Sequence, residues 1–154
     1  MKMKIKSQII KAFVVFSIYA LPLYSQPVST RENCKETLRT AMELFNAEKY
    51  GSAMHEFQKL REIAVPGSVF VDEADYHIPV CYLEMENEKG RSMLEAFIKD
   101  APESPRINNA YLRLGNADFT KKRYKQALVS FKKIERYALS GKELEEYCFK
   151  SGFC

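Results

Sequence analysis

The apolar residues between Ser104 and Tyr137 follow two successive helical stripes. In the first half, Ala110, Leu114 and Ala117 recur at the spacing of one helix face. The second half carries a comparable stripe made of Tyr124, Ala127, Leu128, Phe131 and Ile134. Lysine and arginine side chains surround this second stripe. The pattern predicts two antiparallel amphipathic helices whose apolar faces are covered by each other and by neighbouring elements.

Small residues in this stretch mark where helices are expected to cross. Gly115 costs about 1 kcal/mol relative to alanine inside a helix, so its presence indicates a close approach by a neighbour. Ala127 is expected to be small because the partner helix crosses there. Phe131 follows one turn later and is expected to fill the space between this helix pair and the next.

Two earlier stretches carry weaker versions of the same pattern. A helix over 32–47 is followed by a turn, after which Tyr50, Ala53 and Phe57 repeat the spacing of the later stripe. In the second stretch we place Met93 and Phe97 at the positions of Ala53 and Phe57. The offset is then 40 residues, followed by 34 residues to Ala127, and we expect an enlarged loop near 65–71 to absorb the difference.

Cys81 and Pro79 shape the expectation for the second stretch. We place Cys81 at the small crossing position, as a buried thiol. Pro79 removes a backbone donor and clashes with the preceding helical turn, at a cost of about 3 kcal/mol. The sequence therefore predicts either a kink at Pro79 or a helix that begins late.

The spacing of these residues resembles the signature of the tetratricopeptide repeat family. The resemblance implies an all-α fold, a right-handed α-solenoid of about three helical hairpins (32–64, 71–101 and 104–137) and an incomplete fourth (141–154). Such hairpins are stable only when stacked on neighbours. The residues expected to pack the repeats are Tyr50, Ala53, Phe57, Cys81, Met93, Phe97, Tyr111, Leu114, Gly115, Tyr124, Ala127 and Phe131.

The first 25 residues have the layout of a secretory signal peptide. Met1 to Lys11 is basic, and an apolar run of about a dozen residues follows, which is short for a membrane span. We expect cleavage before Gln26, a short linker over 26–31 and a repeat domain over 32–154. Retention as an uncleaved signal anchor is the alternative, and it would provide the only membrane attachment. The repeats are also similar to those of exported proteins from Gram-negative bacteria of the Bacteroidetes type.

The charge of the chain is concentrated in this leader. The formal net charge is +4, and Lys2, Lys4, Lys6 and Lys11 account for it, since the rest has 20 basic and 20 acidic side chains. A nearly neutral folded part argues against a nucleic-acid partner, which requires a basic surface. The basic cluster at 121–136 is interpreted as a solvated helix face, with a docking patch for an acidic partner as the alternative.

No arrangement of residues indicates catalysis. The four cysteines (Cys34, Cys81, Cys148 and Cys154) lack the CxxC spacing of redox or zinc sites. Cys34 is the freest to form a disulfide, although we expect none. His55 and His77 have no second ligand at metal spacing, and no glycine-rich phosphate loop is present. We therefore expect no enzyme, no metal, no cofactor and no small-molecule substrate.

The resemblance also implies a concave face, lined by the first helix of each repeat. Its residues would be Leu38, Met42, Phe45, Ile78, Tyr82, Met85, Asn109, Leu112, Asn116 and Phe119. Methionine and aromatic side chains adapt well to an extended peptide or a partner helix. The alternative is that this stripe serves only internal packing. The paired lysine and asparagine of the carboxylate-clamp subgroup are absent, so capture of a free peptide C-terminus is not expected.

The sequence thus favours a non-enzymatic scaffold in the periplasm that binds another envelope protein. An accessory factor of outer-membrane protein assembly and a peptidoglycan-associated wall or division factor remain as alternatives. Residues 142–154 resemble the start of a fourth repeat without its partner helix. This leaves two interpretations open: the chain is the front of a longer repeat protein, or its end docks back or onto another subunit.

Overall fold

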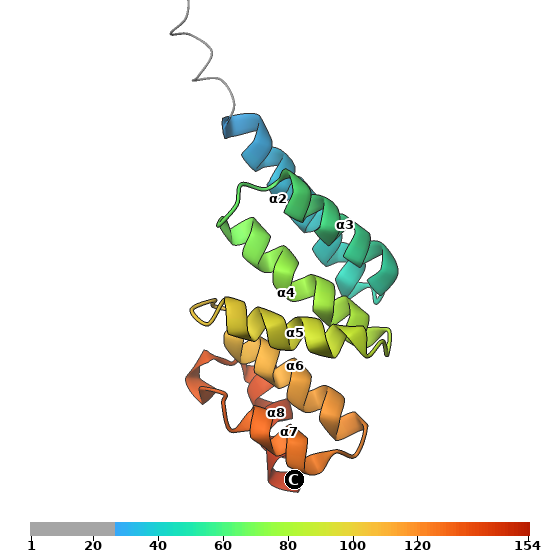
Figure 1. Ribbon diagram of the computed structural model, residues 1–154, viewed down its shortest axis with the longest axis vertical. Helices are drawn as coiled ribbons and strands as arrows, with labels where there is room; N and C mark the ends of the chain where they lie inside the picture. The colour runs from blue at the N-terminus through green and yellow to red at the C-terminus, as the bar shows by residue number, and fades with distance from the viewer. Residues whose placement is uncertain (1–26) are drawn as a thin grey trace, which may run out of the picture. The chain divides into compact units, whose positions relative to one another are not determined.

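A computed structural model describes residues 27–154, so the expected signal peptide and Gln26 lie outside the described residues. These residues form seven α-helices and one 3₁₀ turn, and none of them is in a β-strand (Figure 1). The α-helices are α2 (Pro27–Asn46), α3 (Tyr50–Ile63), α4 (Val69–Glu84), α5 (Lys89–Asp100), α6 (Ile107–Thr120), α7 (Tyr124–Phe131) and α8 (Gly141–Phe153). The expected all-α class is confirmed for this part of the chain.

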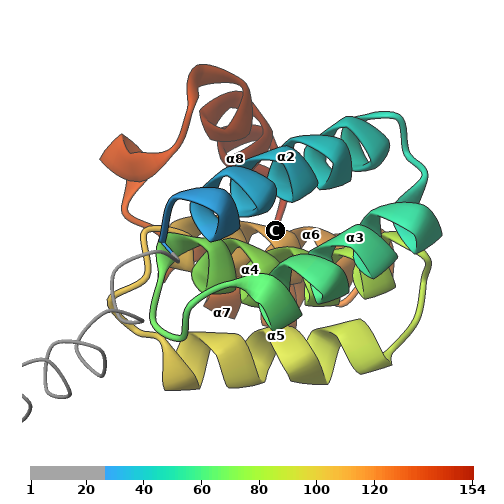
Figure 2. The same ribbon diagram turned by 90° about the horizontal axis from the view of Figure 1, so that it is seen from above.

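Helices that follow one another in sequence also pack against one another. The chain divides after Asn33 into two units, and the second unit comprises residues 34–154. There, α3 packs on α4, α4 on α5, α5 on α6, α6 on α7 and α7 on α8, with further contacts of α6 to α4 and to α8. Figure 2 shows α5 and α8 on opposite sides of α6. Each helix therefore helps to cover the apolar side of the helices packed against it.

The three turns inside the helix pairs have the same backbone conformation. Glu48, Glu86 and Lys122 each have a φ of 57° or 58°, in the left-handed region. Each is followed by a residue whose N–H bonds back across the turn: Lys49 to Leu44, Asn87 to Tyr82 and Arg123 to Asp118. This is the Schellman motif, which satisfies carbonyls at a helix C-terminus. It occurs here without glycine, and its threefold recurrence shows that the hairpins repeat at the level of backbone geometry.

Buried residues in the second helix of each pair, together with one position just beyond α7, recur every 37 residues. Ala53, Gly90 and Ala127 are spaced in this way, as are Phe57, Leu94 and Phe131, and then Leu60, Phe97 and Ile134, and all nine are buried. The offsets of 40 and 34 residues inferred from the sequence are therefore wrong. Gly90, and not Met93, occupies the crossing point, and Phe97 lies one turn beyond the position assigned to it. Met93 is only partly buried, against the first core cluster.

Gly90 is placed by a close contact between helix backbones. A Cβ at this position would lie 2.6 Å from the carbonyl oxygen of Pro79 and 2.6 Å from the backbone nitrogen of Leu83. Only a residue without a side chain allows α5 to approach α4 this closely. Cys81 is fully buried, in the cluster that includes Ala41 and Ala53 of the first hairpin.

Gly115 makes a different contact from the one expected. A Cβ there would overlap the ring of Phe131, so a side chain rather than a helix backbone fills the space above the glycine. Phe131 is fully buried and contacts Tyr147 of α8 edge-on, with ring centroids 5.9 Å apart. It therefore joins the third hairpin to α8.

Several helix boundaries differ from the expected ones. The first helix begins at Pro27 and not at residue 32, and α4 begins at Val69. α4 also continues through Pro79 without a late start, and the fully buried Pro79 ring provides apolar burial that opposes the lost backbone hydrogen bond. α7 ends at Phe131 and not near residue 137. In the segment after α7, the backbone N–H of Glu135 donates to the side-chain oxygen of Asn108, at 2.9 Å.

Candidate functional site

The residues expected to line a concave groove lie mainly inside the packing of the first two hairpins. Leu38, Met42, Phe45 and Tyr82 pack against the first core cluster, and Ile78 is buried within it. Met85 is partly exposed, next to the turn that follows α4.

In the third hairpin, Asn109, Leu112 and Phe119 pack with residues of α8. Leu112 is buried, and Asn109 donates a hydrogen bond to Glu143 of α8 at 2.5 Å. The ring of Phe119 lies 5.4 Å from that of Phe153. Asn116 is partly buried, and its side-chain oxygen has no partner among the described residues. Most of the ten residues thus contribute to contacts between hairpins, as in the packing alternative.

The second and third hairpins are oppositely charged. Residues 64–105 contain nine acidic and three basic side chains, whereas residues 106–137 contain two acidic and nine basic ones. Ion pairs join the two hairpins. Arg106 pairs with Glu73 at 2.6 Å, Arg113 with Glu84 at 3.0 Å, and Lys121 with Glu88. A further pair has the reverse polarity, between Arg91 and the fully buried Asp118 at 2.6 Å. The interface between these hairpins is therefore matched in charge as well as in shape.

His77 is a core residue in this arrangement. Its ring stacks on Phe57, with centroids 4.6 Å apart, and its Nδ1 lies 2.9 Å from the carbonyl oxygen of Glu73. Burial lowers the pKa of His77 to about 4, so the ring is neutral near pH 7. It has the surroundings of a packing residue. His55 is exposed on α3.

The cysteines divide into two buried and two exposed thiols. Burial raises the pKa of Cys81 to about 12, which opposes formation of the reactive thiolate. Cys34 is also buried, and the expectation that it is the freest to pair is wrong. Cys148 and Cys154 are exposed, and all four thiols are unbridged.

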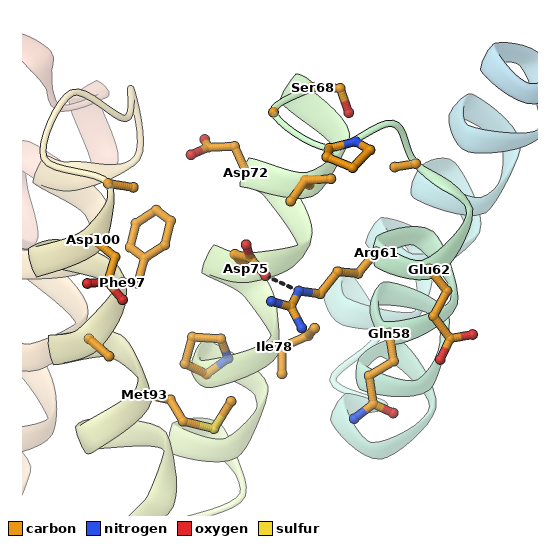
Figure 3. Close-up of a pocket in the computed structure, with 17 residues that line it drawn as sticks. Gln58, Arg61, Glu62, Ser68, Asp72, Asp75, Ile78, Met93, Phe97 and Asp100 are labelled. Atoms are coloured by element: carbon orange, nitrogen blue, oxygen red, sulfur yellow. Dashed lines mark ion pairs between the residues drawn. The ribbon is translucent and has the colours of Figure 1, made fainter. Parts of the chain in front are cut away.

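An open groove has one face of α4 as its floor and is bordered by α3 and α5 (Figure 3). Its volume is about 980 Å³. The floor is one face of α4, formed by Val71, Asp72, Asp75, Ile78 and Pro79. α3 contributes Gln58, Arg61 and Glu62, α5 contributes Met93, Ala96, Phe97 and Asp100, and the connecting segments contribute Ala64, Pro66, Gly67, Ser68 and Ala101. The floor and the α5 wall are thus largely apolar.

The charges around this groove are mostly negative. Four carboxylates line it (Glu62, Asp72, Asp75 and Asp100), with Arg61 as the one cation. Figure 3 shows Arg61 reaching from α3 to α4, where its Nε lies 2.5 Å from Asp75. Asp72 accepts a hydrogen bond from Ser104 at 2.8 Å. Glu62 and Asp100 form no ion pair or hydrogen bond with other described residues, so their charges are available to a ligand.

The groove was not predicted from the sequence, because its existence depends on the distance between α3 and α5, the second helices of two successive hairpins. An apolar face on the first helix of a hairpin is expected to be covered, and the periodicity does not show that α3 and α5 leave a strip of α4 open. The available signal was the mixture of Asp72 and Asp75 with Ile78 on one helix face. Carboxylates at such positions are unusual in a closed apolar contact.

No known family model matches the sequence, and no curated protein is significantly similar to it. Within residues 27–154, no three His, Cys, Asp or Glu side chains are grouped so that they could hold a metal ion. The helices in this part of the chain also include none with the length and apolar character needed to cross a membrane.

Proposed function

We propose that the protein is a non-enzymatic interaction scaffold that binds a basic, amphipathic segment of another envelope protein. In this proposal the chain is a right-handed α-solenoid of tetratricopeptide-like hairpins, exported behind a cleaved signal peptide. The three equivalent turns and the 37-residue recurrence of buried positions support a repeat architecture. The partner is a protein and not a nucleic acid or a small-molecule substrate.

The groove between α3 and α5 is the observation on which this function rests. Its apolar floor offers about 25 cal/mol of stabilisation for each Å² of apolar surface that a partner buries there. Its uncompensated carboxylates favour a segment that carries lysine or arginine beside its apolar residues. The α4 floor from Val71 to Pro79 extends over about 12 Å, which suits about two turns of a partner helix.

Selection of binding peptides from a random display library tests this proposal directly. The purified chain serves as bait, and the enriched peptides are then measured against two variants. Glu62→Gln with Asp100→Asn removes the two carboxylates that have no internal partner. The matched control, Glu86→Gln with Glu103→Gln, makes the same charge change at exposed positions outside the groove.

The expected result is enrichment of peptides with basic and apolar residues, whose affinity falls about tenfold in the groove variant and is unchanged in the control. Affinity should also decrease as salt increases, because part of it is electrostatic. Peptides that bind both variants equally, or that are acidic, would show that the groove is not the binding site.

Export is tested by the intact mass of the protein from the envelope fraction of its host. A mass equal to that of a chain beginning at Gln26 supports export and cleavage. A mass equal to that of a chain that still carries Met1 to Ser25 contradicts cleavage and indicates a scaffold tethered to the membrane.

A further inference from the structure

The outward side of α7 is basic and has one exposed apolar residue at its centre. Residues 121–134 contain six lysine or arginine side chains and no acidic one. Val129 is 64% exposed, and three exposed lysines lie three or four residues from it, so they share its side of the helix and of the turn that directly follows. We call this surface the α7 stripe, and its residues are Lys125, Val129, Lys132 and Lys133. Its lysines form no ion pair or hydrogen bond with other described residues.

The α7 stripe belongs to a row of positions that the repeat leaves exposed. The residues 37 and 74 positions earlier lie in or directly before α5 and α3, and they are exposed too, although a further hairpin packs after each of those helices. They are Glu88, Ser92, Glu95 and Ala96 for α5, and Gly51, His55, Gln58 and Lys59 for α3. The stripe is therefore exposed because of its place within a hairpin and not because of its place near residue 154.

The α7 stripe has the features that the groove over α4 favours in a ligand. The groove offers an apolar floor, and the carboxylates of Glu62 and Asp100 are free to pair with a cation. The stripe offers three unpaired lysines around an exposed valine. From Lys125 to Lys133 it covers about 12 Å at the rise of a helix, which matches the length of the α4 floor. One chain thus carries two separate surfaces that are complementary in charge and in length.

We propose that the α7 stripe of one copy of the chain binds in the α4 groove of a second copy. Within one chain α7 is packed on α6 and α8, so the stripe that enters a groove comes from another molecule. The two surfaces in contact are different, so a bound pair keeps one free groove and one free stripe and further copies can add head to tail. This inference rests on the binding site of the proposed function, and it makes a second copy a competitor of the envelope partner.

Sedimentation of the purified chain from about 10 μM to 1 mM, at low salt and under reducing conditions, measures this association. The stripe variant carries Lys125→Glu with Lys132→Glu, and the groove variant carries Glu62→Lys with Asp100→Lys. A third chain carries all four changes, so that both surfaces are reversed in charge. The matched control makes the charge change of the stripe variant at exposed lysines outside both surfaces, Lys49→Glu with Lys142→Glu.

The expected result is an average mass that rises with the concentration of the wild-type chain. The dissociation constant should increase at least about tenfold in the stripe variant and in the groove variant, and it should be unchanged in the control. Association should return in the chain with all four changes, because the two surfaces are again opposite in charge. Circular dichroism should show the same helix content for every chain.

Three results would overturn the proposal. The first is a wild-type chain that stays monomeric at 1 mM, and a monomeric chain that sediments with vesicles of anionic phospholipid would assign the stripe to a membrane surface instead. The second is association that survives in the stripe variant or in the groove variant. The third is a chain with all four changes that fails to associate although its helix content is unchanged.

The peptides selected in the display experiment separate this inference from the proposed function. They should bind the stripe variant, whose groove is unchanged, and their addition should dissociate the wild-type assembly. Peptides that bind the groove of a wild-type chain that stays monomeric would overturn the inference and leave the proposed function standing. Association that needs both surfaces, without any peptide that binds the groove, would support the inference and contradict the envelope partner.

Discussion

The hairpins α4–α5 and α6–α7 have turns of the same backbone geometry, but they differ in charge and in the helices that pack against them. Both turns have a left-handed residue at the same point of a Schellman motif. The α4–α5 hairpin is acidic and leaves a strip of α4 open between α3 and α5, whereas the α6–α7 hairpin is basic and has α8 packed against it. The backbone is repeated, and the side chains on its faces decide whether a face closes or remains available for binding.

The two hairpins also use their glycines differently. Gly90 allows two helix backbones to meet, whereas Gly115 accommodates a ring. The two hairpins also differ at equivalent core positions, since α4 buries His77 where α6, 37 residues later, buries Leu114. The comparison can therefore be tested by changes that affect one hairpin and spare the other.

The largest effect is expected from breaking the ion pair between Arg91 and the buried Asp118, one of four ion pairs that join the two hairpins. Arg91→Ala leaves the carboxylate of Asp118 fully buried without a cation, at a cost of about 3 to 4 kcal/mol in the free energy of unfolding. Urea denaturation measures this cost. Glu95→Ala removes the exposed partner of Arg91 and should cost less than about 0.5 kcal/mol. A loss below 1 kcal/mol for Arg91→Ala would refute the assigned role.

A pH dependence should distinguish the second hairpin from the third. The pKa of His77 is about 4 in the folded chain and about 6.5 when unfolded, so below pH 6.5 the unfolded state binds a proton that the folded state does not. Stability is therefore unaffected by this group above pH 6.5, and it falls by up to about 3 kcal/mol as the pH decreases to 4.

His77→Leu, which copies the residue found in the third hairpin, provides the control. Glu73 of α4, Arg106 directly before α6 and Arg113 of α6 lie around the ring and remain in this variant. The difference in unfolding free energy between wild type and variant should change between pH 6.5 and 4. A constant difference over this range would show that His77 is not buried in its neutral form.

The glycine substitutions should give the smallest effects. Gly90→Ala forces helix backbones apart and should cost about 2 kcal/mol. Gly115→Ala displaces a side chain instead, and part of that cost is offset by about 1 kcal/mol of improved helix propensity. Thermal denaturation should therefore rank Gly90→Ala as the less stable variant. The opposite ranking would contradict the assigned crossing geometry.

The sequence was sufficient for the all-α class and for the positions of most helices. The apolar stripe that contains Ala127 and Phe131 follows the period of a single helix, so it can be recognised without knowledge of the neighbouring helices. The offset between hairpins was not predictable in the same way. Met93 and Gly90 both fit a helical stripe, and only the contact of Gly90 with Pro79 and Leu83 decides between them.

The candidate site was harder to predict because it depends on the spaces between helices. Residues such as Tyr82 and Leu112 have the chemistry of a binding surface, but neighbouring helices cover them. Asp72 and Phe97 gave no signal of a common site, since they are 25 residues apart and meet only after α5 has packed beside α4. Periodicity identifies which side of a helix is apolar, and it does not identify the element that covers that side.

Site-specific photo-cross-linking from the groove in the native host would decide whether the groove binds a partner. A photoreactive amino acid replaces Met93, on the groove wall, or Gln126, which is exposed on α7 as a control. We expect an adduct from position 93 whose cross-linked segment is basic and apolar, and which is lost when Glu62→Gln and Asp100→Asn are added. No adduct at position 93, an acidic segment there, or the same adduct from both positions would contradict it.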